Sequence, residues 1–328
     1  MQAAWFESFG AAADTLVLGE LPRPEPAPGE VLVKLYTSAV NPSDVKKRAG
    51  AFPKLLDDGL VIPHSDGAGV IAAVGEGVDP ARIGERVFVY QAQYGRRFGT
   101  AAEYVALEAV RAPRLPDEAS FEVGACIGIP IMTAHRCVFA DGDVAGQTVL
   151  VTGGAGRVGY YAIQWAKLAG ARVIATASND SDAALCREMG ADEVVNHREA
   201  GWGLAAIACN NGKNIDRLVE VDFGANLSEV LQCIRIGGTI ATYSSSVAEP
   251  QLPFRDMMFM DLTVRMVIVY AMPEEAKTLA VEDTCAALQA GRLQHRIAHS
   301  VPFGDMVRAH ELIEQGGFGG CVVVNVNA

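Results

Sequence analysis

A glycine-rich turn between two apolar segments constrains the fold of this chain more than any other feature. Residues 148–152 form a short apolar run typical of a buried parallel strand, residues 157–169 carry apolar side chains at helical spacing, and residues 172–177 form a second apolar run. The turn after the first run holds its glycines at the spacing G-x-x-G-x-x-G: Gly153, Gly154, Gly156 and Gly159. Such glycines let a strand pass directly into a helix and let backbone N–H groups approach a pyrophosphate, which the positive end of the helix dipole attracts. Because the turn lies within a β–α–β unit, the pattern predicts a dinucleotide-binding site and not merely a structural turn.

The end of the second apolar run indicates which dinucleotide binds. A carboxylate about 20 residues beyond the glycines would hydrogen-bond the ribose hydroxyls of NAD. Here the strand ends in the small neutral residues 175–179, so a 2′-phosphate meets no like charge. Asp180 and Asp182 follow, and we interpret them as the cap and first turn of a helix over residues 182–189. The pattern therefore favours NADP over NAD.

Length and charge limit the possible partners. The 328 residues are enough for two domains, and the net charge of −12 argues against nucleic acid or an anionic membrane as a partner. The seven cysteines stand singly, without a C-x-x-C pair, as expected for reduced thiols in a cytoplasmic protein. We find no signal peptide pattern and no apolar run of about 18 residues, so we expect no membrane span.

Residues 1–120 read as short strands punctuated by proline and glycine, with no sustained helix apart from a short one that Asn41-Pro42 opens. The expected strands are Gln2–Phe6, Leu16–Glu20, Glu30–Val40, Ala68–Val74, Arg86–Val89, Glu103–Ala106 and Val110–Ala112. Together they resemble an irregular β-barrel.

From residue 120 onward strands alternate with helices. The expected strands lie near 149–152, 172–177, 193–196, 217–220, 238–243 and 263–269, and they predict a doubly wound parallel sheet of the Rossmann type. An amphipathic helix over 273–291 and a strand–helix–strand over 296–326 follow, and we expect the latter to rejoin the first domain. The chain is thus expected to be an α/β protein, with a barrel-like domain of residues 1–124 and 272–328 and a dinucleotide-binding domain of residues 125–271.

Seven segments carry a family resemblance: PGEVLVKLYTSAVNPSDVKKRAG (28–50), IPHSDGAGVIAAVGEGV (62–78), GTAAEYV (99–105), GIPIMTAH (128–135), TGGAGRVG (152–159), MGADEVVNHRE (189–199) and AHELIEQG…GGCVVV (309–324). Along essentially the whole chain they resemble the medium-chain dehydrogenase/reductase superfamily, and within it the zinc-free quinone oxidoreductase branch that includes zeta-crystallin. The resemblance implies a GroES-like barrel beside the Rossmann domain and an oxidoreductase that uses NADPH.

The positions of the zinc ligands favour this branch. The zinc alcohol dehydrogenases carry cysteine where Asn41 stands and His-Glu where Ser65-Asp66 stands. His64 comes one residue early, so we interpret it as a structural or surface histidine, and we predict no metal site. Without a zinc ion to polarise a carbonyl, electron-poor acceptors such as quinones and conjugated enones suit the site best.

The resemblance also assigns roles to residues of this chain. Asn41 would donate a hydrogen bond to the substrate oxygen beside the nicotinamide, or else it only forms an Asx turn before Pro42. The proton would come from Lys46, Asn41 or water. The other residues implied for cofactor binding are Thr133 at the carboxamide, Ala155, Gly156, Arg157 and Val158 at the pyrophosphate, Ser178, Asn179, His197 and Arg198 near the 2′-phosphate, Asp222 at ribose or adenine, and Tyr243, Ser244, Ser245, Ile268, Val269 and Tyr270 on the nicotinamide side. Alternatively, Thr133 is an ordinary helix residue and Arg198 a solvated one.

Some positions depart from the family pattern. Tyrosines usual in quinone reductases are replaced by Lys46 and Phe52, and Phe52 has no proton to give. The lysine and arginine that bind the 2′-phosphate in some relatives are replaced by Asp182 and Gly316, so we suggest Arg157 as a substitute cation.

The leading hypothesis is NADPH-dependent reduction of quinones by hydride transfer. Reduction of alkenals, enones or enoyl thioesters is the alternative within enzymes, and a non-catalytic NADPH-binding protein is the alternative outside them. The apolar edge segment 262–269 predicts a homodimer, unless the helix over 273–291 covers that edge.

Overall fold

The glycine-rich turn connects β7 (Thr148–Val151) to α5 (Arg157–Leu168), which leads to β8 (Arg172–Ala177), as the sequence predicts. In this computed structural model, which describes residues 1–327, the turn packs too tightly for side chains. A Cβ atom at Gly159 would lie 2.3 Å from the carbonyl oxygen of Gly153, and one at Gly154 would lie 2.7 Å from the Cys186 Sγ atom. The glycines are therefore required by close packing of turn, helix and strand.

The chain divides into two compact units, the first being Met1–Ile129 with Val281 onward and the second Pro130–Ala280. The boundaries expected from the sequence fall after residues 124 and 271, and residue 328, the last of the expected first domain, lies outside the described residues. In the second unit a parallel sheet has the strand order β12-β11-β10-β7-β8-β9. Its other strands are β9 (Glu193–Asn196), β10 (Ile215–Glu220), β11 (Ile234–Thr242) and β12 (Thr263–Met266). The predicted Rossmann-type sheet is confirmed.

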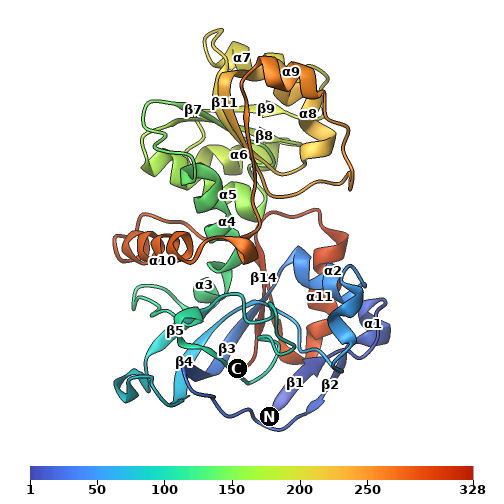
Figure 1. The fold of residues 1–328 in the computed structure, drawn as a ribbon, viewed down its shortest axis with the longest axis vertical. Coiled ribbons are helices and arrows are strands. Elements are labelled where there is room, and N and C mark those ends of the chain that lie inside the picture. The colour runs from blue at the N-terminus through green and yellow to red at the C-terminus, as the bar shows by residue number, and fades with distance from the viewer. Residues whose placement is uncertain (328) are drawn as a thin grey trace. The chain divides into compact units, whose positions relative to one another are not determined.

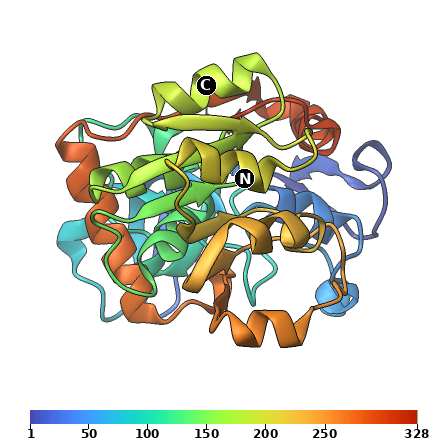
Figure 2. The same cartoon turned by 90° about the horizontal axis from the view of Figure 1, so that it is seen from above.

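Helices cover both faces of this sheet (Figures 1 and 2). Leu150, Leu218 and Ile240 pack in one core with residues of α7 and α8, whereas α5 lies against β7 and β8. Because side chains alternate along a strand, the neighbouring buried residues Val149 and Val219 face the opposite side. The helices of this unit, in chain order, are α4 (Ile129–Phe139), α5, α6 (Asp180–Glu188), α7 (Trp202–Cys209), α8 (Phe223–Cys233), α9 (Phe254–Phe259) and α10 (Glu274–Gln289), of which α4 begins and α10 ends in the first unit.

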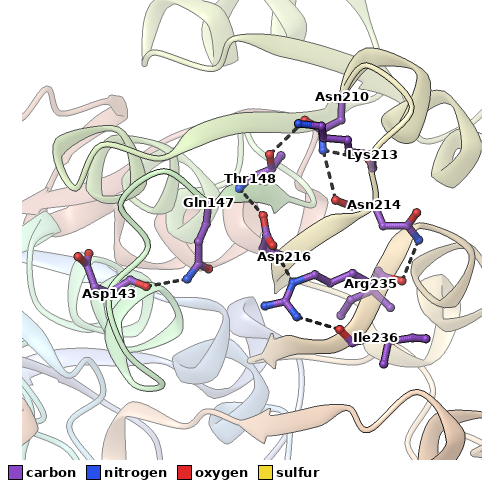
Figure 3. Close-up of polar contacts among 10 residues, drawn as sticks. Asp143, Gln147, Thr148, Asn210, Lys213, Asn214, Asp216, Arg235 and Ile236 are labelled. Carbon is purple, nitrogen blue, oxygen red and sulfur yellow. Dashed lines mark hydrogen bonds and ion pairs between the residues drawn. The ribbon is translucent and has the colours of Figure 1, made fainter.

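A polar network joins the amino ends of the central strands (Figure 3). The Asp216 carboxylate accepts from the Thr148 backbone N–H at 2.8 Å and from Arg235 Nε at 2.7 Å. The Asn210 amide accepts from the Thr148 hydroxyl and donates to the carbonyls of Lys213 and Asn214. At the amino end of the sheet these polar groups thus hydrogen-bond to one another. The glycine turn lies at the opposite, carboxyl end, where open α/β sheets bind ligands.

The first unit is built around the long strand β3. Its sheet has the order β13-β14-β3-β4-β5, with β6 also pairing with β3. The strands and helices are β1 (Gln2–Trp5), α1 (Ala12–Thr15), β2 (Val17–Glu20), β3 (Glu30–Val40), α2 (Pro42–Arg48), β4 (Asp66–Val74), β5 (Arg86–Val89), β6 (Tyr104–Glu108), α3 (Phe121–Cys126), β13 (Ile297–Pro302), α11 (Met306–Gln315) and β14 (Cys321–Asn325). Because β14 pairs antiparallel with β3, the C-terminal segment completes the sheet that the N-terminal segment begins.

One expected strand is wrong and another is too long. Val110–Ala112 is not a strand; a 3-10 turn, η3 (Ala109–Arg111), occupies most of it. The last strand of the parallel sheet ends at Met266, and Val269–Ala271 forms another 3-10 turn, η4. Other 3-10 turns are η1 (Pro53–Leu56), η2 (Pro80–Arg82) and η5 (Phe303–Asp305). Apolar side chains suit a strand, but a segment becomes one only where a neighbouring strand accepts its hydrogen bonds.

Candidate active site

The start of α5 is shaped to receive an anion. Gly153 and Gly154 donate their backbone N–H groups to Thr176 of β8, and Gly156 donates to Gly153. Gly156 then precedes α5 as its N-cap and brings no side chain to satisfy the first amide groups of the helix. Ala155 is buried under the turn and Val158 is half-buried. The predicted pyrophosphate residues thus form a cradle of backbone amides at a helix N-terminus, which fits a dinucleotide.

The predicted 2′-phosphate residues lie at the carboxyl ends of β8 and β9. Asn179 caps α6, accepting from the Asp182 backbone N–H at 2.9 Å and donating to the Asp182 carboxylate at 2.8 Å. The helix begins at Asp180, so the interpretation of Asp180 as its cap is wrong, whereas that of Asp182 as a first-turn residue agrees with this geometry. His197 is half-buried, and burial is the main cause that lowers its pKa; the charge of Arg198 lowers it further, and the charge of Asp182 raises it. Arg198 itself is exposed, so the edge offers both an available cation and a carboxylate.

The carboxyl ends of β10 and β11 are joined by hydrogen bonds. Asp222 accepts from the backbone N–H groups of Ala225 and Ser246, while the Ser244 carbonyl accepts from the Phe223 N–H and the Ser245 hydroxyl accepts from the Gly224 N–H. The predicted residues Asp222, Ser244 and Ser245 are therefore brought together. Tyr243 adjoins them, and burial raises its pKa well above the ordinary value.

Sequence reasoning missed Glu220, the last residue of β10. Its side chain is fully buried, Oε1 accepts from the Asp222 N–H and from Asn226, and Oε2 has no partner among the described residues. Burial raises the pKa of this carboxyl. An acidic residue that ends an otherwise apolar strand is the signal that could have found it.

The remaining predicted residues of the second unit differ in how far their side chains are exposed. Thr133 is buried within α4, and Val269 and Tyr270 are buried in η4. Ile268 precedes η4 with its side chain largely exposed. The structure therefore places Ile268 at the surface of its unit, unlike its two neighbours.

Asn41 is the centre of the site in the first unit. The extended backbone expected before Pro42 is present, and Asn41 precedes α2 as its N-cap. Its backbone N–H donates to Asp44 Oδ2 at 2.8 Å, and its side-chain Nδ2 donates to Asp66 Oδ2 at 2.8 Å. Asn41 is therefore held through both its backbone and its side chain. It is buried at 3 % exposure, and its Nδ2 atom carries one further N–H.

Asp66, at the start of β4, is completely buried. Its Oδ2 atom also accepts from the Ile129 backbone N–H at 2.9 Å, while Oδ1 has no partner in the described chain and would lie 2.2 Å from a Cβ atom at Gly128. Burial raises its pKa to about 7 despite the hydrogen bonds from Ile129 and Asn41, which lower it. Removing the carboxylate from water therefore outweighs the two donors.

The lysine brought to this site is Lys47, whereas the predicted Lys46 is exposed. The Lys47 Nζ atom donates to the backbone carbonyl and to the side-chain oxygen of Gln93, each at 2.7 Å. Burial lowers its pKa, and the carboxylates of Asp44 and Asp66 oppose that shift. Consecutive helix residues point about 100° apart, so Lys46 faces a different direction from Lys47.

His64 is buried, and both its ring nitrogens are hydrogen-bonded within the protein. Nδ1 lies 2.8 Å from the Ser38 hydroxyl, and Nε2 lies 2.9 Å from Nε2 of His310. The interpretation of His64 as a structural histidine agrees with these contacts. Among residues 1–327 no group of three or more histidine, cysteine, aspartate or glutamate side chains is arranged to hold a metal ion. The helices of the same residues include none with the length and hydropathy of a membrane span.

Comparison with known proteins identifies the family. Residues 27–117 match the family model described as alcohol dehydrogenase GroES-like domain, and residues 158–283 match the one described as zinc-binding dehydrogenase. The chain is 31 % identical to the quinone oxidoreductase of Homo sapiens over 323 residues, covering 96 % of this chain and 94 % of that protein.

Two solved structures extend the likeness to three dimensions. The mycobacterial protein Rv1454c, solved in complex with NADPH, has a TM-score of 0.87 and 26 % identity, over 99 % of this chain and 100 % of that one. The quinone oxidoreductase from Coxiella burnetii has a TM-score of 0.85 and 26 % identity, over 100 % and 99 % of the two chains. A pyridine nucleotide fits the glycine cradle described above. The chain therefore belongs to the quinone oxidoreductase branch of the medium-chain dehydrogenase/reductase superfamily and is an oxidoreductase.

Proposed function

We propose that this protein is an NADPH-dependent reductase of quinones that works without zinc. The observation that carries the proposal is the Asn41–Asp66 pair, which stands where the zinc dehydrogenases carry metal ligands and is hydrogen-bonded within the protein at 2.8 Å. Support also comes from the named activity of the human relative and from the NADPH held by the mycobacterial one.

A nicotinamide nucleotide held by these residues would supply a hydride. The chain's own residues bind and orient the reactants. The amides at the start of α5 bind the diphosphate, and the second N–H of Asn41 donates to the acceptor oxygen on which negative charge develops. Because Asp66 and Asp44 hold Asn41 before substrate arrives, the donor needs no reorientation during the reaction.

Purified protein should oxidise NADPH faster when 1,4-benzoquinone is added, also after treatment with a chelator and with no zinc detected by elemental analysis. Asn41→Ala should lower kcat by about a hundredfold, the usual effect of losing one such donor. A purified enzyme that needs zinc, or that reduces no quinone, would contradict the proposal.

Alkenals and enoyl thioesters remain the second class of acceptor, because the resemblance covers reductases of conjugated double bonds. Adding 2-hexenal and crotonyl-CoA to the same assay separates the two classes. NADPH binding without turnover of any acceptor would instead indicate the non-catalytic alternative.

The preference for NADPH is proposed from the neutral end of β8, the exposed Arg198 after β9, and the half-buried Arg157 at the start of α5. Arg198→Ala and Arg157→Ala should each raise the Michaelis constant for NADPH several-fold and leave that for NADH unchanged, because a phosphate contact is lost. Arg187→Ala, an exposed arginine in the last turn of α6, is the matched control. No change in either variant would remove both arginines from the site.

A further inference from the structure

A row of buried side chains connects α11, near the C-terminus, to the start of β4. Arg48 Nε donates to His310 Nδ1 at 3.4 Å, and His310 Nε2 lies 2.9 Å from His64 Nε2. His64 Nδ1 lies 2.8 Å from the Ser38 hydroxyl, which lies 2.7 Å from the Thr100 hydroxyl. Thr100 ends the row by donating to the backbone carbonyl of Asp66 at 2.6 Å.

The two ends of this row fix the direction of every hydrogen bond in it. Arginine has only donors, so His310 Nδ1 must accept and His310 Nε2 must carry the proton. His64 Nε2 then accepts, which places the proton of His64 on Nδ1. Ser38 therefore accepts from His64 and donates to Thr100, which donates to a carbonyl that can only accept. Both histidines are neutral, each in a defined and opposite tautomer.

Burial maintains this state. The pKa of His64 is lowered to about 3, first by burial and then by the charge of Lys47. The pKa of His310 is lowered well below its ordinary value by burial, with the neighbouring His64 and Arg48 adding to the effect. Arg48 is itself completely buried and paired with Glu314 of α11 and the Gly10 carbonyl.

We propose that His64 and His310 are positioning residues of the active site. Their one-way chain of hydrogen bonds fixes the backbone of Asp66, and through the Asp66 carboxylate it fixes the Asn41 amide. The chain ends on a backbone carbonyl, which passes no proton onward, so it serves to orient groups and not to relay protons. The backbone of His64 supports this reading, because it is held at φ +76°, a conformation that costs a non-glycine residue energy and persists where surrounding contacts enforce it.

The role of Asn41 in this inference rests on the proposed function, but the tautomers can be tested without it. Nitrogen-15 spectra of histidine-labelled protein distinguish protonated from unprotonated ring nitrogens. We expect one buried histidine protonated only on Nδ1 and a second only on Nε2, unchanged between pH 5 and pH 8. Assignment uses His64→Gln and His310→Gln. His310 protonated on Nδ1, or either ring charged at pH 6, would overturn the proposal.

The positioning role is tested by a pair of variants. His310→Leu should lower kcat about tenfold or more, since small misplacements of a catalytic group are costly, and leave the Michaelis constant for NADPH unchanged. His310→Gln, whose amide can still donate to His64, should recover most of that loss. His299→Leu is the control, because His299 lies in the same unit, packs against Phe318 and takes no part in this row of hydrogen bonds.

Failure of the two proposals can be told apart. If His310→Leu folds and keeps its kcat, the positioning role is wrong while the proposed function stands. If the wild type reduces no acceptor, the proposed function is wrong. The positioning role is then tested by the NMR signal of the Asn41 side-chain amide. That signal should shift in His310→Leu and not in His299→Leu, and an equal spectrum in both would overturn the positioning role.

Discussion

The protonation of the Asp66 carboxyl is controlled by its buried surroundings. It accepts two N–H donors and feels the charge of Lys47, each of which favours the ionised form, yet burial raises its pKa to about 7. The nearby carboxylate of Asp44 acts in the same direction as burial. A group with this pKa changes charge within the working range of most enzymes.

We predict that Asp66 makes stability depend on pH. Its pKa is 3.8 when unfolded and about 7 when folded, so the folded protein binds the proton more tightly. That stabilisation is complete below the unfolded pKa and is lost as pH rises through about 7. Relative to Asp66→Asn, the wild type should lose about 3 kcal/mol of unfolding free energy between pH 5 and pH 8.

Urea unfolding of both proteins at several pH values measures this difference. The comparison is needed because the buried His64 and His310, with lowered pKa values, act in the opposite direction below about pH 6.5 and are common to both proteins. If the difference in unfolding free energy between the two proteins stays constant from pH 5 to pH 8, the raised pKa is refuted.

For single residues, the sequence predicts which residue types form the site better than it predicts their hydrogen-bond partners. It points to Asn41 through the Asn-Pro motif, but it selects Lys46 where the structure buries Lys47. It also gives no sign that His310, 246 residues from His64 along the chain, hydrogen-bonds to it. Both depend on how α2 and α11 dock on the sheet, which no local pattern reports.

At the scale of elements, the β7–turn–α5 unit is the part that local sequence specifies best. Its glycines, apolar runs and helix start act within about ten residues of one another, so no distant contact is needed to predict them. The 3-10 turns η3 and η4 are the counterexample, since their apolar residues resemble strands and only the lack of a pairing strand decides otherwise.

We predict that Gly159→Ala weakens nucleotide binding and lowers Tm. The added methyl group would lie 2.3 Å from the Gly153 carbonyl oxygen, so the turn or the first turn of α5 must move. Gly304→Ala is the control, because a Cβ atom there meets nothing within 4 Å. Calorimetric titration with NADPH and thermal unfolding should show a several-fold higher Kd and a Tm lower by several degrees only for Gly159→Ala. Equal behaviour of the two variants would show that the turn tolerates a side chain.

At the scale of the whole molecule, the sequence predicts the order of the two folds along the chain. Near residue 120 the sequence changes from short strands separated by turns to strands that alternate with helices. The first pattern indicates an antiparallel sheet and the second a parallel one. The sequence also predicts that the last strands rejoin the first domain, because the parallel sheet is complete without them, but it does not predict that β14 pairs with β3.

The edge of the parallel sheet carries an apolar surface that the single chain leaves open. β12 is an edge strand, and around it Phe254, Phe259, Met266 and Ile268 are 73, 76, 66 and 56 % exposed. Met257 of α9 and Met260, the C-cap that follows the helix, pack against the core of the unit. The helix α10 leaves these side chains exposed, contrary to the alternative in which it covers the edge. Exposed apolar side chains at a sheet edge favour pairing with a second copy about a twofold axis.

We therefore predict a homodimer that pairs through β12 and α9. Light scattering after size exclusion should give about twice the chain mass of 34.7 kDa for the wild type. Met266→Asp should give the mass of one chain, because a charge buried in such an interface has no partner. Leu204→Asp, a substitution at another exposed apolar residue of the second unit, should leave the dimer intact. A monomeric wild type would rule out the dimer, and a Met266→Asp protein that stays dimeric would place the interface elsewhere on the molecule.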